Sequence, residues 1–499
     1  MKKSVLYFFI FLFAFSWNVD AQKTYKNPIL AGDYPDPTIM RDGDDYYMTH
    51  SAFLYRPGLV VYHSKDLVNW EPISAALNEF RGSGWASDIK KFGNKYYIYF
   101  TYLARPQSTY VVTADSPYGP WSEPVSLKIG AGIDPCVVEA DGKKYLFISG
   151  GLRYTLTDDG MSVVPDSRVK IYEAWECPSD WIIEAESLEG PKVYHIGEYY
   201  YYVCAQGGTA GPASSHMVVV ARSKSIDGPF EHMPKNPLIH TYDAADRWWS
   251  KGHGSLIDTP EGKGYCVYHG YEKGYHTMGR QTLMDPVHFT KDGWIVSDGG
   301  NSEGELPSPF NVKQKPMDKS RLGEFRIGLD WRFFQQYKPE RVSVKDRVLT
   351  LQAEGKVPED SAPLLFVASD HNYEFEAEIN IHGDVHAGLL LFYNSRYNKG
   401  TAFSKKNVYH THNYGYDDRS VKKAVSGYEH MWLRVRYQDH IIICYYSLDG
   451  KKWIKEICSR NLEGYNHNTL NGFLSLLPGI FCAGDGYAEF KNFKYRALD

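Results

Sequence analysis

The sequence predicts an all-β protein in which a five-bladed β-propeller precedes a β-sandwich. Three observations predict this fold class. A turn followed by an aromatic strand recurs along the first 300 residues, at spacings of about 50 to 65 residues. A different β rhythm, without this repeat, runs from Phe325 to Asp499. No long amphipathic helical pattern interrupts either part.

The turn-and-aromatic signature has five copies, and each reads as a hairpin turn that leads into a tyrosine-rich strand. The copies are Arg41–Tyr47, Lys91–Tyr97, Ala140–Tyr145, His195–Tyr200 and Pro260–Tyr265. A second repeated motif follows most of these copies, at Ser64–Trp70, Ala114–Trp121, Arg222–Phe230 and Thr290–Trp294. Five such units predict five four-stranded blades, each of which buries one face on its neighbour.

The 499 residues exceed what one hydrophobic core usually organises, which favours two domains. The N-terminus starts with two lysines, continues with an apolar run and ends in small residues at Ala21, the layout of a secretory signal peptide. We therefore expect a signal peptide over 1–21, a propeller over 22–312, a linker over 313–324 and a β-sandwich over 325–499. Export to the periplasm or the cell exterior follows, and because Gln22 stands where a lipid-bearing cysteine would be, no lipid anchor is expected.

Composition excludes several classes of partner. The net charge is −5 without a block of basic residues, which argues against nucleic acid. No later apolar stretch is long enough to enter a membrane, and no protein partner is indicated. Seven widely spaced cysteines predict mainly buried thiols, and a bridge within the group Cys444, Cys458 and Cys482 stays open. The 40 tyrosines and 12 tryptophans suit sugar rings as well as they suit sheet packing.

Polar residues open the blades and are expected to converge, because the first strand of each propeller blade lines the central channel. They are Asp36, Asp88, Asp134, Glu189 and His253. Carboxyl groups that share a partly desolvated pocket push one another's pKa values apart. Inverting glycoside hydrolysis needs such a pair, one acid and one base roughly 6.5 to 9.5 Å apart. Asp88 matches no catalytic role, so we expect it to have a structural or substrate-contacting part.

Five motifs in series resemble glycoside hydrolase family 43 over roughly residues 25 to 300. They are Asn27–Leu30 (NPIL), Tyr34–Pro37 (YPDP), Asp42–Tyr47 (DGDDYY), Gly132–Pro135 (GIDP) and Glu189–Pro191 (EGP). The resemblance implies a five-bladed propeller and a reaction that inverts the anomeric centre. It makes Asp36 the general base, Glu189 the general acid, and Asp134 the residue that orients the acid and raises its pKa. The C-terminal part is similar to the concanavalin-like accessory domain of the xylosidase-like branch.

The resemblance also points to residues that contact the substrate. His253, in Gly252–Gly254, matches a histidine beneath the active site that holds an ion in some members. It is therefore a candidate metal ligand, for a structural calcium near the channel centre, as well as a substrate contact; a buried histidine without a ligand is the alternative. Arg280 resembles a substrate-contacting arginine, or it pairs with a channel carboxylate. Phe53 and Trp85 are expected to stack on sugar, or else to fill the blade core. No cofactor is required.

Two departures from the family pattern bear on the sugar. Trp85–Ser87 stands where the family carries Trp-Ala-Pro, and Arg56 stands where xylosidase-like members carry an aromatic residue. We expect Arg56 at the pocket rim and therefore favour a non-reducing-end α-L-arabinofuranosidase that acts on arabinose- or xylose-containing plant cell-wall oligosaccharides. The alternatives are a β-xylosidase, an endo-acting enzyme, and a carbohydrate-binding propeller without catalysis.

Overall fold

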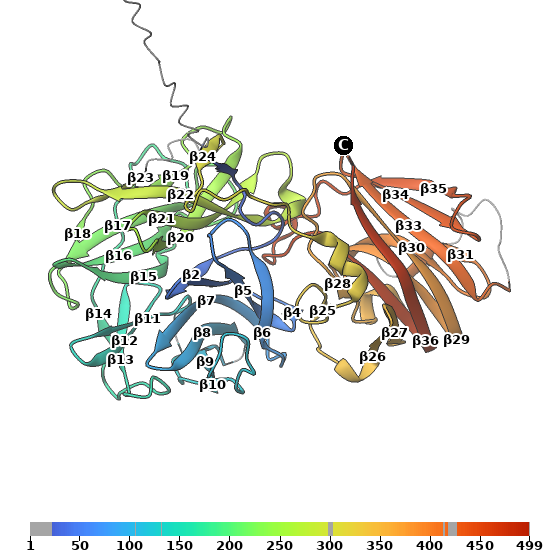
Figure 1. The fold of residues 1–499 in the computed structure, drawn as a ribbon, viewed down its shortest axis with the longest axis horizontal. Helices are drawn as coiled ribbons and strands as arrows, with labels where there is room; N and C mark the ends of the chain where they lie inside the picture. The colour runs from blue at the N-terminus through green and yellow to red at the C-terminus, as the bar shows by residue number, and fades with distance from the viewer. Residues whose placement is uncertain are drawn as a thin grey trace, which may run out of the picture.

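The computed structural model describes residues 22–104, 106–130, 132–297, 303–412, 415–417 and 427–498, without the side chains of 412, 415–417, 457 and 458. The predicted signal peptide and the side chain of Cys458 lie outside this part of the chain. Within it, the regular structure is almost all strand, and the one α-helix is the short α1 (His467–Leu470). Figure 1 shows two lobes, a propeller and a sandwich, which confirms the predicted fold class.

Five sheets form the propeller lobe, in blades that follow one another along the chain (Figure 1). Their strands, listed in chain order, are β2 (Thr38–Asp42), β3 (Asp45–Thr49), β5 (Gly58–Ser64) and β6 (Glu71–Leu77); β7 (Ser83–Phe92), β8 (Lys95–Leu103), β9 (Ser108–Ala114) and β10 (Val125–Ser126); β11 (Cys136–Ala140), β12 (Lys143–Ile148), β13 (Leu152–Leu156) and β14 (Val169–Lys170); β15 (Glu189–Ile196), β16 (Tyr199–Gln206), β17 (Met217–Ser223), β18 (Glu231–His232) and the added β19 (Ile239–His240); and β20 (Trp248–Asp258), β21 (Gly264–Glu272), β22 (Arg280–Phe289) and β23 (Ile295–Ser297).

The repeat predicted the hairpins correctly. Each of the five signature turns joins the first strand of a blade to the second, as at Asp42–Asp45 and Ile196–Tyr199. The first strands of the five blades surround one axis. Residues of all five line a cavity of about 1090 Å³ there. At the ends of the lobe, β1 (Thr24–Lys26) pairs with β24 (Glu305–Pro307), so the segment that follows blade five is tied to the segment that precedes blade one.

The second lobe is built on two long antiparallel strands, β29 (Tyr373–Asn394) and β36 (Leu477–Ala497), which pair along nearly their whole length. The two halves of this pair belong to different layers of the sandwich. The strands that pair with one half complete one layer, and the strands that pair with the other half complete the second layer. The remaining strands are β25 (Arg332–Phe334), β26 (Val342–Lys345), β27 (Val348–Gln352), β28 (Leu364–Leu365), β30 (Tyr397–Phe403), β31 (Val408–His412), β32 (Gly415–Asp417), β33 (His430–Gln438), β34 (Ile441–Ser447) and β35 (Ile454–Asn461). Gly484 and Gly486 have φ of +114° and +137° between the halves, where a Cβ would meet backbone oxygen at 2.3 and 2.0 Å.

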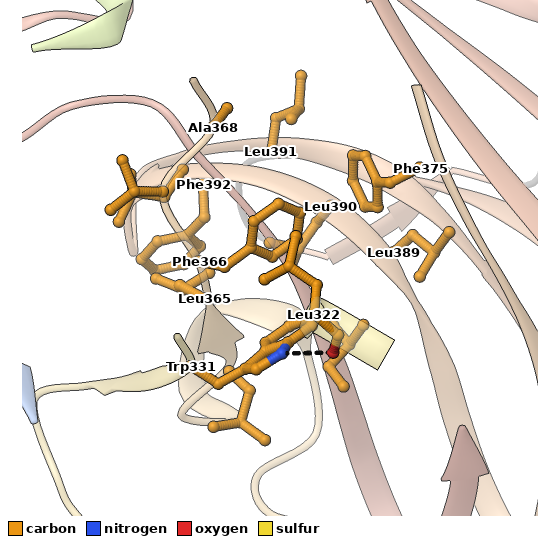
Figure 2. Packing of buried hydrophobic residues seen from close by; sticks show 14 of the residues in the cluster. Leu322, Trp331, Leu365, Phe366, Ala368, Phe375, Leu389, Leu390, Leu391 and Phe392 are labelled. Atoms are coloured by element: carbon orange, nitrogen blue, oxygen red, sulfur yellow. Dashed lines mark hydrogen bonds between the residues drawn. The ribbon is translucent and has the colours of Figure 1, made fainter. Parts of the chain in front are cut away.

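One hydrophobic cluster reaches from the first blade into the sandwich. It contains Tyr34 and Tyr62 of the propeller together with the fully buried Trp331 and Phe366 of the sandwich. Figure 2 shows its sandwich part, where the Trp331 Nε1–H donates to the Leu322 carbonyl at 2.9 Å. The short strand β4 (Tyr55–Arg56) of the propeller even joins the sandwich sheet by pairing with β25. The two domains therefore share a core.

The segment predicted as a linker is docked on both domains. The Lys26 N–H donates to Gln314 at 2.9 Å, and the Lys315 N–H donates to Asn69 at 2.7 Å. Leu322, at the other end of the segment, is buried in the shared core. In the described residues, Cys136, Cys177, Cys204, Cys266 and Cys482 are free thiols. No helix of the described chain is long and apolar enough to cross a membrane.

Candidate active site

A pocket of about 100 Å³ is lined by loops and strand ends of several blades and by one residue of the sandwich. Seven of the eight predicted site residues line it: Asp36, Phe53, Trp85, Asp134, Glu189, His253 and Arg280. These residues are up to 244 positions apart in the sequence, as Arg280 is from Asp36. The propeller topology brings them together because they lie on strands of the blades, or just before those strands, around one axis; His253 and Arg280 both belong to blade five.

Asp36 and Asp134 are placed by the same local construction. Each lies two residues before the first strand of its blade, is followed by proline, and has a left-handed backbone with φ of +56° and +58°. Aspartate tolerates this conformation better than most residues do. The kink turns the side chain away from the strand line and into the pocket, where both carboxyls are buried.

The Asp36 carboxylate is held by two side chains. Arg280 donates from Nη1 to Oδ1 at 2.8 Å, and Ser51 donates from Oγ to Oδ2 at 2.5 Å. The Asp36 N–H donates to Nδ1 of His269 at 3.0 Å, and burial lowers the pKa of His269 to about 4, so this ring is a neutral acceptor. Burial, the largest single effect, would raise the pKa of Asp36, but the Arg280 guanidinium together with His253 and His269 outweighs it and holds that pKa well below its usual range. Asp36 is therefore ionised.

Glu189 and Asp134 have the opposite electrostatic environment. Burial, and then the negative charges of Asp134 and Asp36, raise the pKa of Glu189 well above its usual range. Burial and the charge of Asp36 raise the pKa of Asp134 to about 7. The Gly190 N–H donates to Asp134 Oδ2 at 3.1 Å, which ties Asp134 to the backbone directly after Glu189. The pocket thus holds an ionised carboxylate and a protonated one, the pair that acid–base hydrolysis requires.

Gly190, directly after Glu189, packs closely on the His253 ring. Its φ is +56°, and a Cβ at this position would lie 3.0 Å from the His253 ring. His253 itself is buried, and its Nδ1 lies 3.4 Å from Asp36 Oδ1. Burial lowers the pKa of His253 to about 3, so it is a neutral ring that packs beneath the acid and the base.

The surroundings of His253 are a poor match for calcium, which takes six to eight oxygen ligands. The nearest groups are the rings of His216 and His269 and the guanidinium of Arg280, while Asp36 is already bound by Arg280 and Ser51. The described residues contain no group of three or more His, Cys, Asp or Glu side chains that could hold a metal ion. These side chains alone do not fit a calcium ion.

Arg56 does not line the pocket, so the expectation that it lies at the rim is wrong. Its side chain is fully buried and donates to four backbone carbonyls, those of Phe53, Tyr55, Glu79 and Gly82. Its guanidinium also lies over the Phe80 and Tyr102 rings. An arginine before Pro-Gly is expected at the surface, but the segment between β6 and β7, which carries Glu79, Phe80 and Gly82, covers this one.

Asp88 also lies outside the pocket, although it is in the channel as predicted. It is 1% exposed, and its Oδ1 accepts from Lys192 Nζ at 3.1 Å. Its Oδ2 accepts the Val137 N–H of the next blade at 2.8 Å. These contacts favour the structural part over the substrate-contacting one, since Asp88 cross-links three blades below the pocket.

Aromatic side chains form one wall. Phe473 of the sandwich stacks on Phe53 with ring centroids 5.9 Å apart and meets Trp85 edge-on at 5.1 Å. The Arg280 guanidinium lies over both phenylalanine rings. No feature of the sequence placed Phe473 here, because its loop belongs to the other domain. Ser51, Thr209 and Glu184 were missed as well, since nothing in their local sequence marks them as site residues.

Comparison with known proteins agrees with this geometry. The family profile "Glycosyl hydrolases family 43" matches residues 25–295, which contain every carboxyl group of the pocket. The chain belongs to this family. The profile "Beta xylosidase C-terminal Concanavalin A-like domain" matches residues 324–496 of this family 43 glycoside hydrolase.

Relatives of this family 43 chain carry two kinds of name. It is 33% identical to "Non-reducing end alpha-L-arabinofuranosidase BoGH43B" of Bacteroides ovatus, over 71% of this chain and 70% of that protein. It is 27% identical to "Putative beta-xylosidase" of Escherichia coli, over 95% and 99%. Among solved structures, the GH43 BlXynB protein from Bacillus licheniformis has a TM-score of 0.84 at 27% identity and covers 95% of this chain and 100% of its own.

Proposed function

We propose that this enzyme is an exo-acting, inverting glycosidase that releases a terminal α-L-arabinofuranosyl group from the non-reducing end of plant cell-wall oligosaccharides. The observation that carries the proposal is the pocket in which Asp36 is ionised while Glu189 is protonated. Its small volume and its closure by Phe473 favour one terminal sugar over the interior of a long chain. A carbohydrate-binding protein without catalysis would have no need of this pair.

In the proposed reaction each carboxyl group has one part. Glu189 donates its proton to the leaving oxygen, and Asp36 accepts a proton from the water that attacks the opposite face of the sugar. Arg280 and Ser51 each occupy one lone pair of Asp36, so its remaining lone pairs are available to that water. Asp134 holds the backbone after Glu189 and keeps the acid protonated by its proximity. No cofactor takes part.

The choice of sugar rests on the relatives. Arg56 and Ser87, which favoured arabinofuranose in the sequence, do not line the pocket and therefore carry no weight. The relative that is 33% identical is named an α-L-arabinofuranosidase, and this supports the first choice. A β-xylosidase is the second candidate, supported by the name of the C-terminal domain and by the Escherichia coli relative that matches nearly the whole chain. Export through a signal peptide over 1–21 is part of the proposal.

Two aryl glycosides test the proposal. Purified protein that lacks residues 1–21 is assayed for release of 4-nitrophenol from the α-L-arabinofuranoside and the β-D-xylopyranoside, and the anomer first released is identified by NMR. We expect preferential turnover of the arabinofuranoside with inversion. Preference for the xyloside would select the second candidate, retention would contradict the assigned roles, and no turnover of either would contradict exo-acting pentosidase activity.

A further inference from the structure

A long loop of blade four runs beside the pocket. Residues 171–188 join β14 to β15 and contain no helix or strand. A loop of this length in a compact domain commonly carries function. Its last part reaches the active site, because Glu184 lines the pocket and Glu189 follows at the start of β15.

Apolar side chains, some half-buried and some exposed, cluster on this loop and just after the neighbouring strand β19. Trp175, Trp181, Ile182 and Tyr242 form what we call the apolar platform. Trp181 meets Trp175 at 6.0 Å and Tyr242 edge-on at 6.2 Å between ring centroids. Tyr242 is 71% exposed and Ile182 is 68% exposed, more than any other large apolar residue of the described chain. Neither domain covers these two side chains.

The platform has a rigid base. The Trp181 ring stacks on His240 at 4.3 Å with the planes 7° apart, and Tyr242 meets the same imidazole edge-on at 4.8 Å. His240 is buried and its Nε2 lies 2.9 Å from the Ser214 carbonyl, which can only accept, so this nitrogen donates. Exposed rings that are already held in place lose little entropy on binding, which favours a binding surface.

The platform is fixed to the pocket wall. Ile182 lies two residues before Glu184, and its carbonyl accepts from Ser214 Oγ at 3.2 Å. The Glu184 N–H donates to Ser215 Oγ at 2.8 Å, and the Glu184 carboxylate accepts the Ala210 N–H at 2.7 Å. A chain that leaves the pocket on this side therefore meets the platform at once.

Acidic side chains border the platform. Glu176, Asp180, Glu186 and Asp243 are exposed in its loop or directly after Tyr242, whereas the exposed Glu173 is paired with Lys170 at 2.6 Å. Carboxylates accept hydrogen bonds from sugar hydroxyls and repel anions. Aromatic faces with a polar edge suit sugar rings.

From this arrangement we propose that the apolar platform binds the leaving-group part of the substrate, and that this part is an uncharged oligosaccharide chain. The proposal rests on the proposed function, because it needs a glycosidic bond to be cleaved in the adjacent pocket. It adds a binding site for the sugars beyond the scissile bond and a preference for neutral chains over those that carry uronic acid.

The test compares a substrate that reaches the platform with one that does not. The first is β-1,4-xylotetraose with one α-L-arabinofuranosyl branch, and the second is 4-nitrophenyl α-L-arabinofuranoside. If xylose is the sugar released, xylotetraose replaces the first substrate and the aryl xyloside replaces the second. The measured quantity is kcat/KM for the oligosaccharide divided by kcat/KM for the aryl glycoside. For Tyr242→Ala we expect this ratio to fall about 5- to 10-fold, because a stacked ring is lost. Ile182→Ser, a second variant, should lower it in the same direction. Tyr118→Ala, which removes a tyrosine that is 57% exposed on another blade, should leave the ratio unchanged.

The outcomes separate this inference from the proposed function. If the wild type is active and the ratio is unchanged in both platform variants, the platform is not a sugar site. The exposed apolar surface would then serve a partner other than the substrate. A wild type that turns over neither aryl pentoside would overturn the proposed function instead. The same tetrasaccharide with a glucuronosyl branch should be the poorer substrate at low salt, and the difference should shrink as salt is added. Equal turnover of both would overturn the preference for neutral chains.

Discussion

Asp36 and Asp134 have nearly the same backbone, yet the pKa values of their carboxyl groups are shifted in opposite directions. Both follow a turn, have a left-handed φ and precede a proline, so local sequence treats them alike. Their neighbours separate them: Arg280 lies 2.8 Å from Asp36, whereas Asp134 accepts only a backbone N–H and is buried near another carboxylate. The identity of the base is therefore decided by one arginine from the last blade.

Replacing Glu189 by Gln removes the proton donor and keeps the size of the side chain. We expect kcat/KM on natural oligosaccharides to fall by about 10²- to 10⁴-fold, the contribution of general acid catalysis. An aryl glycoside with a good leaving group should lose far less, because its oxygen needs little protonation. Glu261→Gln, in an exposed hairpin far from the pocket, is the matched control. Equal losses on both substrates would contradict the assignment of Glu189 as the acid.

Replacing Arg280 by Met should move the pH profile of kcat/KM to higher pH. Asp36 must be ionised, so activity is lost as pH falls through its pKa, and Arg280 lowers that pKa. Glu189 must be protonated, so activity is lost as pH rises through its pKa, and Arg280 lowers that pKa too. Without the positive charge both limbs should shift upward. Arg280→Lys keeps the charge and should shift them less, whereas an unmoved acid limb in Arg280→Met would count against the electrostatic role.

At the scale of single elements, Arg56 in β4 lies outside the pocket but still positions one of the residues that line it. Arg56 holds Phe53 directly through the Phe53 carbonyl, and Phe53 is part of the aromatic wall of the pocket. The same guanidinium binds the carbonyls of Glu79 and Gly82, just before β7. Arg56 is thus a hub that fixes two segments of backbone, and it acts on the pocket only through them.

Replacing Arg56 by Met should destabilise the protein by about 2 to 4 kcal/mol, because four backbone carbonyl groups, two of them in buried contacts, lose their donor. Thermal unfolding measures this as a lower Tm. Arg81→Met, which removes an exposed arginine of the same region, should change the stability by less than about 0.5 kcal/mol. The ratio of arabinofuranoside to xyloside turnover should not change in Arg56→Met. A changed ratio at an unchanged Tm would restore Arg56 to the substrate site.

At the scale of the whole molecule, the sandwich completes the active site. Its loop after α1 carries Phe473, whose N–H donates to His467 Nδ1 at 2.9 Å and whose ring stacks on the same imidazole at 4.1 Å. The shared hydrophobic core keeps this loop over the propeller. The accessory domain is therefore part of the pocket.

Replacing Phe473 by Ala should raise KM for the aryl pentoside about tenfold, since the ring closes the pocket and stacks on Phe53. Phe289→Ala, which removes a half-exposed ring elsewhere on the propeller, should leave KM unchanged. Both variants should keep a near-native circular dichroism spectrum. An unaltered KM in Phe473→Ala would mean that the sandwich only supports the propeller.

The order of the elements and the three carboxyl groups assigned to catalysis could be predicted from the sequence, whereas Ser51, Glu184 and Phe473 could not. Five repeats of a turn and an aromatic strand predicted five blades, because hairpin turns and alternating strands are local features. The acidic residues that open those blades were found for the same reason. Long-range packing accounts for the rest: the burial of Arg56, the bonds of Ser51 and Arg280 to Asp36, and the entry of Phe473 from the other domain. Such contacts join residues hundreds of positions apart, and their energies depend on distance and burial, which local sequence does not encode.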